Sequence, residues 1–300
     1  MQQNKIHFER KRSFVKLNLT PYEKSDLIPR GTLQTFEMEM IPYPDHRRRT
    51  IRVWLPEDYD GEKRFPVVYL HDGQGLFQMG DGQFKLNADR ALASLREEGI
   101  SAIVVGVDNG PERGTELTPP LKRGAPGRIV NGFKIPLIPD ESTTALYAEF
   151  IVEHLKPLID ENFMTLPDCA NTCVGGISAG GSCSYYMILK YPQVFSKAII
   201  CSPGFPMFDL DAMLRELDEY DMDALKDHRL VFYNGDQGID VTSFDYVIAV
   251  YKKLKERGLT RLDMMLLMDT RQTHSEAAWG KYLPEFLRFL FAKDNSEPGN

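Results

Sequence analysis

Short, uninterrupted apolar runs recur along the chain and constrain its fold more than any other feature. Segments of helix length separate them, and the runs lie at residues 65–70, 102–107, 172–175, 197–201 and 230–233. A strand that is apolar at every position is buried on both faces, as in parallel sheets. Because the runs alternate with helices, the pattern predicts an α/β fold with a mostly parallel sheet and helices on both faces.

Two earlier segments have a different periodicity. Residues 32–40 and 50–55 alternate polar and apolar side chains, which is typical of antiparallel strands with one solvent-facing side. Pro42, Pro44 and Asp45 supply a turn between them. We therefore expect these strands to form an antiparallel N-terminal edge of the sheet.

The chain has 300 residues, 42% of them apolar and 26% charged, which fits one globular domain over residues 1–300. We expect residues 1–30 to form an extended lead-in. Two connections, at 109–142 and 202–228, are long for a compact domain, and connections of that kind are usually functional lids or disordered segments. Both follow predicted strands, so both should emerge at the carboxyl edge of the sheet, where ligands bind.

Charge and cysteine content exclude several classes of function. The net charge of −7 argues against a nucleic-acid partner, and no stretch approaches the roughly 20 apolar residues that span a bilayer. The polar first 12 residues lack the apolar core of a signal peptide, so the expected location is the cytoplasm. The four cysteines lack zinc-site spacing, so no metal is expected. The oligomeric state stays open.

The strongest chemical signal is the sequence Gly-Ile-Ser-Ala-Gly at residues 176–180. It follows the apolar run 172–175 and precedes a helix-like segment at 182–190. A nucleophile elbow requires this strand–turn–helix setting: glycines permit a strained turn that exposes the serine, and the helix N-terminus directs its amides at developing negative charge. The pattern predicts Ser178 as a nucleophile, with an ordinary glycine-rich turn as the alternative.

A serine nucleophile needs a base. Of the six histidines, only His274 follows a late predicted strand (residues 263–268) and precedes the final helix. The chain order that accompanies this elbow is serine, acid, histidine. His274 is therefore the predicted base, and a histidine that caps the helix is the alternative.

The acid should follow the predicted strand at 230–233, because a carboxylate there can orient the histidine and stabilise its charged form. Asp236 and Asp240 both lie in the stretch that follows. Asp236 could instead be a turn residue and Asp240 a helix N-cap. The local sequence favours neither.

The oxyanion hole should combine the amide of Ala179 with one from the loop after the strand at 65–70. That loop contains Gly73 and Gln74, and either amide could serve. His71 precedes it and is expected to pack or cap the loop rather than transfer protons.

From about residue 32 to 292, the chain resembles the esterase family of α/β-hydrolases that includes feruloyl and acetylxylan esterases, siderophore esterases, esterase D-type hydrolases and mycolyltransferases. The resemblance rests on the order and spacing of several segments: residues 69–74 with Leu76-Phe77, 104–109 with Arg113 and Glu116, 175–181, Tyr191-Pro192 with 194–195, Ser202-Pro203, and His274-Ser275-Glu276 with Ala278-Trp279. It implies an α/β-hydrolase fold and a carboxylic ester hydrolase without metal or organic cofactor. In such proteins the last aspartate of an Asn-Gly-x-x-Gly-x-Asp-like stretch is the triad acid, which favours Asp240 over Asp236.

The expected substrate is a small ester of feruloyl, acetyl-sugar or siderophore type. An acyltransferase that uses the same triad with an alcohol acceptor is the alternative, and a non-catalytic binding protein is disfavoured because all triad members are present. Arg113 and Glu116 are candidate substrate-binding residues. The insertion at 121–138 matches no pattern of the family, and its cations Lys122, Arg123 and Arg128 could favour an anionic or phenolic-acid substrate or simply be exposed charge.

Overall fold

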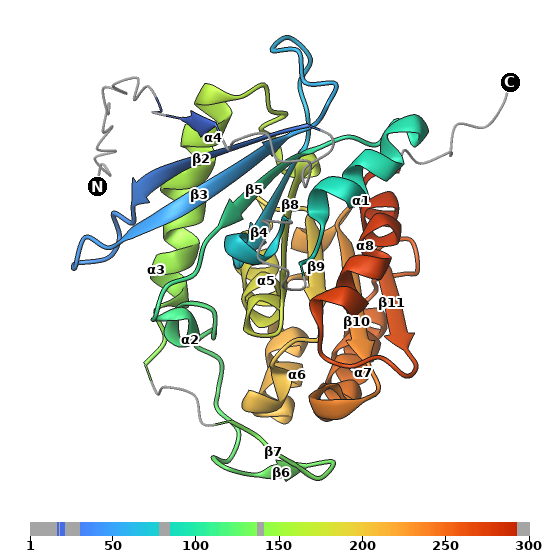
Figure 1. The fold of residues 1–300 in the computed structure, drawn as a ribbon. Coiled ribbons are helices and arrows are strands. Elements are labelled where there is room, and N and C mark those ends of the chain that lie inside the picture. Colours follow the sequence, from blue (N-terminus) through green and yellow to red (C-terminus); the bar gives the residue numbers. More distant parts are fainter. Residues whose placement is uncertain (1–16, 18, 22–30, 78–84, 137–140, 293–300) are drawn as a thin grey trace, which may run out of the picture.

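The computed structural model describes residues 17, 19–21, 31–77, 85–136 and 141–292. Its centre is a nine-stranded sheet in the order β1-β2-β3-β5-β4-β8-β9-β10-β11 (Figure 1). The strands are β1 Thr20–Pro21, β2 Thr32–Glu39, β3 Arg48–Leu55, β4 Val67–His71, β5 Ile103–Val107, β8 Thr172–Ile177, β9 Lys197–Cys201, β10 Arg229–Gly235 and β11 Met264–Asp269.

The fold class predicted from the sequence is confirmed. Strands β4, β5 and β8 to β11 pair in parallel, while β1, β2 and β3 form an antiparallel edge that joins the rest through β5. Each predicted strand is present, with ends that differ by a few residues. The lead-in expected at residues 1–30 lies outside the described residues, except for Leu17 and residues 19–21, where β1 pairs with β2.

Helices cover both faces of the sheet and create two apolar cores. Helices α1 (Ala88–Leu95) and α8 (Glu276–Phe291) pack on one face. The other face carries α5 (Ala179–Lys190), α6 (Leu210–Glu219), α7 (Val241–Glu256) and a long helix made of α3 (Thr144–Glu149), a π-helical segment (Phe150–Leu155) and α4 (Lys156–Asn162). In β4, Val67 and Tyr69 face one core while Val68 and Leu70 face the other, which explains why the central strands are apolar at every position.

The two long connections are more structured than expected. The first contains α2 (Arg113–Glu116) and a hairpin of β6 (Ile129–Val130) and β7 (Phe133–Lys134), and its residues 137–140 lie outside the described part. The second contains helix α6 and short 3₁₀ turns. Both start at the carboxyl ends of strands, and the hairpin protrudes beyond that edge of the sheet (Figure 1).

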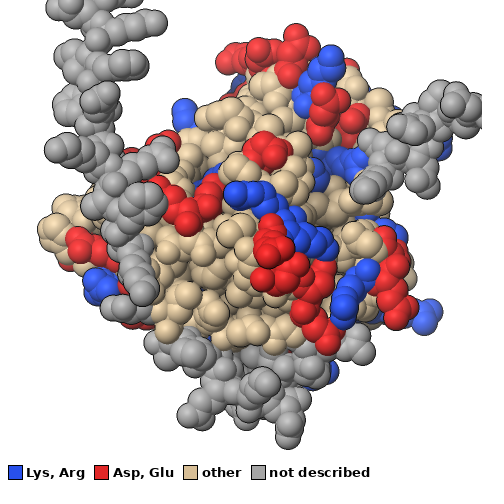
Figure 2. Space-filling view, turned by 90° about the horizontal axis from the view of Figure 1, so that it is seen from above, with Lys and Arg blue, Asp and Glu red and all other residues tan. Residues whose placement is uncertain are grey.

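Charged side chains are interspersed on the face seen in Figure 2. Acidic and basic groups lie side by side there on a mostly uncharged surface, and the described residues form no continuous basic patch on this face. Over the described residues, no helix combines the length and the apolar character that crossing a membrane requires.

A buried ion network joins α2 to β3. Glu116 is 1% exposed, and its Oε1 accepts hydrogen bonds from Arg49 Nη2 at 2.7 Å and from Arg47 Nη1 at 3.0 Å. Arg49, itself 7% exposed, also donates to the half-exposed Glu112 at 3.2 Å. Burying an unpaired guanidinium costs free energy, so the ion pairs with Glu116 stabilise both arginines. Through these pairs Glu116 holds the connection after β5 against β3.

We predict that Glu116→Gln lowers the free energy of unfolding by about 3 kcal/mol, because two partly buried guanidiniums lose their shared carboxylate. The matched variant Glu112→Gln removes a carboxylate that is 41% exposed and should cost less than about 1 kcal/mol. Urea titration of both variants provides the measurement. Equal losses in the two variants would contradict this account of the network.

Candidate active site

Ser178 occupies a strained turn between β8 and α5. Its backbone has φ of 59° and ψ of −123°, a combination that non-glycine residues rarely adopt. The flanking glycines have no room for a side chain: a Cβ at Gly176 would lie 2.6 Å from the carbonyl carbon of Gly180, and a Cβ at Gly181 would lie 2.8 Å from the oxygen of Cys201. The glycines thus allow the close packing of α5 on β8 that presents the serine at the carboxyl edge of the sheet.

Asp240 is the carboxylate that contacts His274. It is 1% exposed, and its Oδ1 accepts a hydrogen bond from His274 Nδ1 at 2.6 Å. Its Oδ2 accepts from the hydroxyl of Ser202 at 2.9 Å and from the amide of Gly235 at 3.2 Å. Buried charge requires such compensation, and the donors here orient both oxygens.

Asp236, the other candidate acid, is half-buried, and its hydrogen bonds are to residues other than His274. Its Oδ1 accepts hydrogen bonds from the amide of Arg271 at 2.6 Å and from the side chain of Gln237 at 2.9 Å. It joins the loop after β10 to the loop after β11, as a turn residue would.

Two residues without an assigned role in the sequence analysis support this pair. The indole Nε1 of Trp279 donates to the Ser202 hydroxyl at 2.9 Å, and the same indole meets the His274 ring edge-on, with centroids 4.8 Å apart. The available signal was the position of Ser202 directly after a buried strand and of Trp279 one helical turn beyond the base. Neither position alone reveals a contact with the acid.

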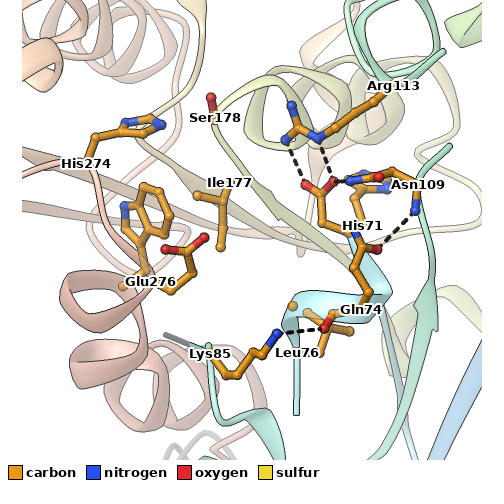
Figure 3. A pocket seen from close by; sticks show the side chains of 13 residues that line it. His71, Gln74, Leu76, Lys85, Asn109, Arg113, Ile177, Ser178, His274 and Glu276 are labelled. Atoms are coloured by element: carbon orange, nitrogen blue, oxygen red, sulfur yellow. Dashed lines mark hydrogen bonds and ion pairs between the residues drawn. The ribbon is translucent and has the colours of Figure 1, made fainter. Parts of the chain in front are cut away.

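A cavity of about 410 Å³ opens beside Ser178 and His274. Figure 3 shows the His274 ring extending toward the serine, with Glu276 below it and Arg113 and Asn109 on the opposite wall. Among the residues that the structure describes, none provides a hydrogen bond or ion pair to the Glu276 carboxylate. The cavity therefore joins the predicted nucleophile and base and is lined with polar groups.

Arg113 lines this cavity, but its guanidinium is engaged with Asp72. The Nε and Nη2 atoms donate to the two carboxylate oxygens at 2.6 and 2.8 Å, and Asn109 donates to the same carboxylate at 2.5 Å. Burial opposes ionisation of Asp72, yet the hydrogen bond and charge of Arg113 outweigh it and hold the pKa of Asp72 below its usual value. The hydrogen bond to Asp72 in turn raises the pKa of Arg113.

The ion pair fixes the loop that was predicted to supply an oxyanion amide. Asp72 has a left-handed backbone, with φ of 57°, and begins a 3₁₀ turn over Gly73–Gly75. Within this turn the amide of Gly75 donates to the carbonyl of Asp72, and the amide of Leu76 donates to the carbonyl of Gly73. The amides of Gly73 and Gln74 donate in neither of these two hydrogen bonds. Gln74 lines the cavity, while Gly73 is buried so closely against β5 that a Cβ would lie 2.6 Å from Asp108 Oδ1.

His71 is buried beneath the loop, where its Nδ1 lies 3.0 Å from the hydroxyl of Tyr147. Burial lowers the pKa of His71 to about 4, so the ring stays neutral at physiological pH. This environment suits the packing role expected for it.

Other candidates lie away from the cavity. Glu116 is enclosed by the Arg47 and Arg49 network and does not line it. The cations of the insertion are also engaged elsewhere: Lys122 pairs with Asp209, Arg123 donates to the carbonyl of Pro119, and Arg128 donates to the carbonyls of Pro206 and Phe208. These contacts remove the basis for inferring an anionic substrate from the insertion. No group of three His, Cys, Asp or Glu side chains suited to a metal ion occurs among the described residues.

Comparisons with known proteins show the family and the fold of the chain. The family model described as Putative esterase matches residues 45–290. A protein of Xylanibacter ruminicola named endo-1,4-beta-xylanase/feruloyl esterase is 26% identical over 166 residues, which are 53% of this chain and 20% of that protein. The chain thus spans about a fifth of the length of that relative.

Solved structures share the fold at low identity. The BES protein from Bacillus cereus aligns with a TM-score of 0.64 at 19% identity, covering 86% of this chain and 95% of the other. An IroE-like serine hydrolase from Shewanella oneidensis aligns with a TM-score of 0.64 at 20% identity, covering 86% and 80% of the two chains. The ferric enterobactin esterase of Salmonella typhimurium aligns with a TM-score of 0.62 at 19% identity, covering 85% and 57%.

The family match covers most of the chain, and the fold is the α/β-hydrolase arrangement expected from the sequence. The chain belongs to the Putative esterase family and is a carboxylic ester hydrolase.

Proposed function

We propose that the protein hydrolyses a small carboxylic ester through an acyl-enzyme, with Ser178 as nucleophile, His274 as base and Asp240 as the acid that orients it. The observation that carries the proposal is the 2.6 Å hydrogen bond between Asp240 and His274 beside a serine held on a strained elbow. A buried carboxylate fixes the tautomer of the histidine and stabilises its protonated form, which makes the ring an effective base.

The chemistry follows from this arrangement. As Ser178 Oγ attacks the ester carbonyl carbon, His274 Nε2 takes the hydroxyl proton. Collapse of the tetrahedral intermediate breaks the bond to the alcohol oxygen, which receives the same proton from His274. Water then gives a proton to His274 and attacks the acyl carbon, which releases the carboxylic acid and restores the serine hydroxyl.

The oxyanion of each tetrahedral intermediate would accept hydrogen bonds from two amides. Ala179 is the first residue of α5, so its amide belongs to the unpaired first turn and adds the helix dipole. The second amide comes from Gln74 or Gly73, in the turn that Asp72 and Arg113 hold in place. Gln74 is favoured because it lines the cavity.

The cavity favours a polar substrate group without a large net charge. The charges of Asp72 and Arg113 compensate each other, and the remaining polar lining includes the Glu276 carboxylate and the side chains of Gln74, Asn109 and Lys85. The Gln74 side chain accepts from the backbone amide of Asn109, and Lys85 donates to the carbonyl of Gln74. Hydroxyl groups can donate to such carboxylate and carbonyl oxygens. Feruloyl, acetyl-sugar and siderophore-type esters are therefore the first substrates to test, in keeping with the names of the similar proteins.

We predict that Ser178→Ala lowers the rate of p-nitrophenyl acetate hydrolysis by at least about 10³-fold, because the acyl acceptor is lost. Circular dichroism of the variant should match the wild type, since the change removes one half-buried hydroxyl. Equal rates in the two folded proteins would rule out Ser178 as the nucleophile.

The two candidate acids give a matched pair of variants. Asp240→Asn should reduce kcat by about 10⁴-fold, because an amide favours the wrong histidine tautomer. Asp236→Asn leaves the contact between Asp240 and His274 untouched and should keep nearly wild-type activity. Steady-state kinetics on both purified variants measures the difference, and a larger loss in Asp236→Asn would reverse the assignment.

A further inference from the structure

Ser178 and His274 also border a second cavity, on the opposite side of the nucleophile from β4. Its volume is about 120 Å³, against about 410 Å³ for the first. The first cavity is lined by residues that follow β4 and β5, whereas the second is lined by residues that follow β9 and β10 and by the insertion. The reacting serine therefore lies between two compartments of different size.

The wall of the second cavity is apolar and comes partly from the insertion. The insertion contributes Ile135 and Pro136, the segment after β9 contributes Pro203 and Met207, and the turn before α7 contributes Ile239. Ile135 is 4% exposed. The insertion, which fits no pattern of the family, thus closes one side of this compartment.

Several contacts hold this wall in place. Arg128 donates to the carbonyl of Phe208 at 2.7 Å and lies over the ring of Tyr246. The amide of Gly124 donates to the carbonyl of Met207 at 3.1 Å, and Asn131 donates to the carbonyl of Val241 at 2.7 Å. These bonds anchor the insertion both to the segment after β9 and to the start of α7, so hydrogen bonds hold the walls of the cavity together.

The polar groups in this cavity are already satisfied by the protein. Ser202 donates to Asp240 at 2.9 Å, Thr242 donates to the carbonyl of Ile239 at 2.7 Å, and Ser243 donates to the carbonyl of Pro203 at 2.8 Å. A compartment whose hydroxyls are taken up in this way offers a ligand mainly apolar contact.

We infer that the second cavity binds the acyl group of the ester and that the substrate carries a short apolar acyl chain. This inference rests on the proposed hydrolase function. The alcohol is assigned to the first cavity for a chemical reason: the water that cleaves the acyl-enzyme approaches from the position the alcohol has left, by microscopic reversibility. A bound water needs two to four polar partners, and the first cavity, with Glu276, Gln74 and Asn109 in its wall, has the more polar lining of the two.

The volume limits the acyl chain. The second cavity is small, because its volume of about 120 Å³ is less than a third of the 410 Å³ of the first. Acetyl to butyryl groups suit this space better than hexanoyl or octanoyl chains, which would press on the wall at Ile135. Among the proposed substrates the inference therefore selects the acetyl-sugar type over the feruloyl and siderophore types, whose acyl groups are larger.

The test compares p-nitrophenyl acetate, butyrate, hexanoate and octanoate. For the wild type, kcat/KM should fall by at least about tenfold between butyrate and octanoate. Ile135→Ala should relieve that fall by about tenfold, and Ile135→Trp should move it to shorter chains, with butyrate losing about tenfold relative to acetate. Ile129→Trp, on the same hairpin but 72% exposed, should keep the wild-type profile.

A second series holds the acetyl group constant and varies the alcohol from methyl to phenyl to a sugar, and the Ile135 variants should follow the wild-type order. Acyl profiles that are unchanged in folded, acetate-active Ile135 variants would overturn the acyl assignment alone. A change in alcohol preference instead would place the alcohol in this cavity and overturn it as well. Absence of wild-type turnover with p-nitrophenyl acetate, or equal turnover in Ser178→Ala, would overturn the hydrolase mechanism and this inference with it.

Discussion

The buried carboxylate of Asp240 is the point on which the site depends. A charge that is 1% exposed is stable only when donors surround it, and these come from Ser202 after β9, Gly235 at the end of β10 and His274 after β11. The segments that follow β9, β10 and β11 therefore meet at the Asp240 carboxylate. Trp279 of α8 joins the same network through Ser202 and packs against the His274 ring, so a helix that covers one face of the sheet also contacts the site.

The other ion pairs around the site mainly hold backbone segments in place. Asp72 and Arg113 hold the turn that presents Gln74, and Glu116 holds α2 through Arg47 and Arg49. Lys122 and Arg128 of the insertion bind a carboxylate and carbonyls of the segment after β9. The result is a polar cavity and an apolar one on either side of Ser178, with walls that are fixed by ion pairs and hydrogen bonds.

Sequence periodicity predicted the fold because a strand that is buried on both faces, such as β4, is apolar at every position, and such a run is visible in the sequence. The same signal was weaker where an element is short or has one exposed side. Helix α1 and helix α6 were not predicted, and α6 was included in a long connection at 202–228. The ends of the strands differ from the predicted ends by at most two residues, because hydrogen-bond pairing rather than side-chain polarity decides where a strand stops.

The sequence by itself predicted the order of the candidate catalytic residues along the chain: Ser178 on a nucleophile elbow, an acid after the next-but-one strand, and a histidine before the last helix. These depend on local properties, namely glycine spacing, apolar runs and chain order. Only the tertiary structure placed Asp240 rather than Asp236 against His274, turned Glu116 away from the cavity and formed a second compartment from the insertion. The physical reason is that these outcomes depend on contacts between segments distant in sequence, whose geometry is fixed by packing.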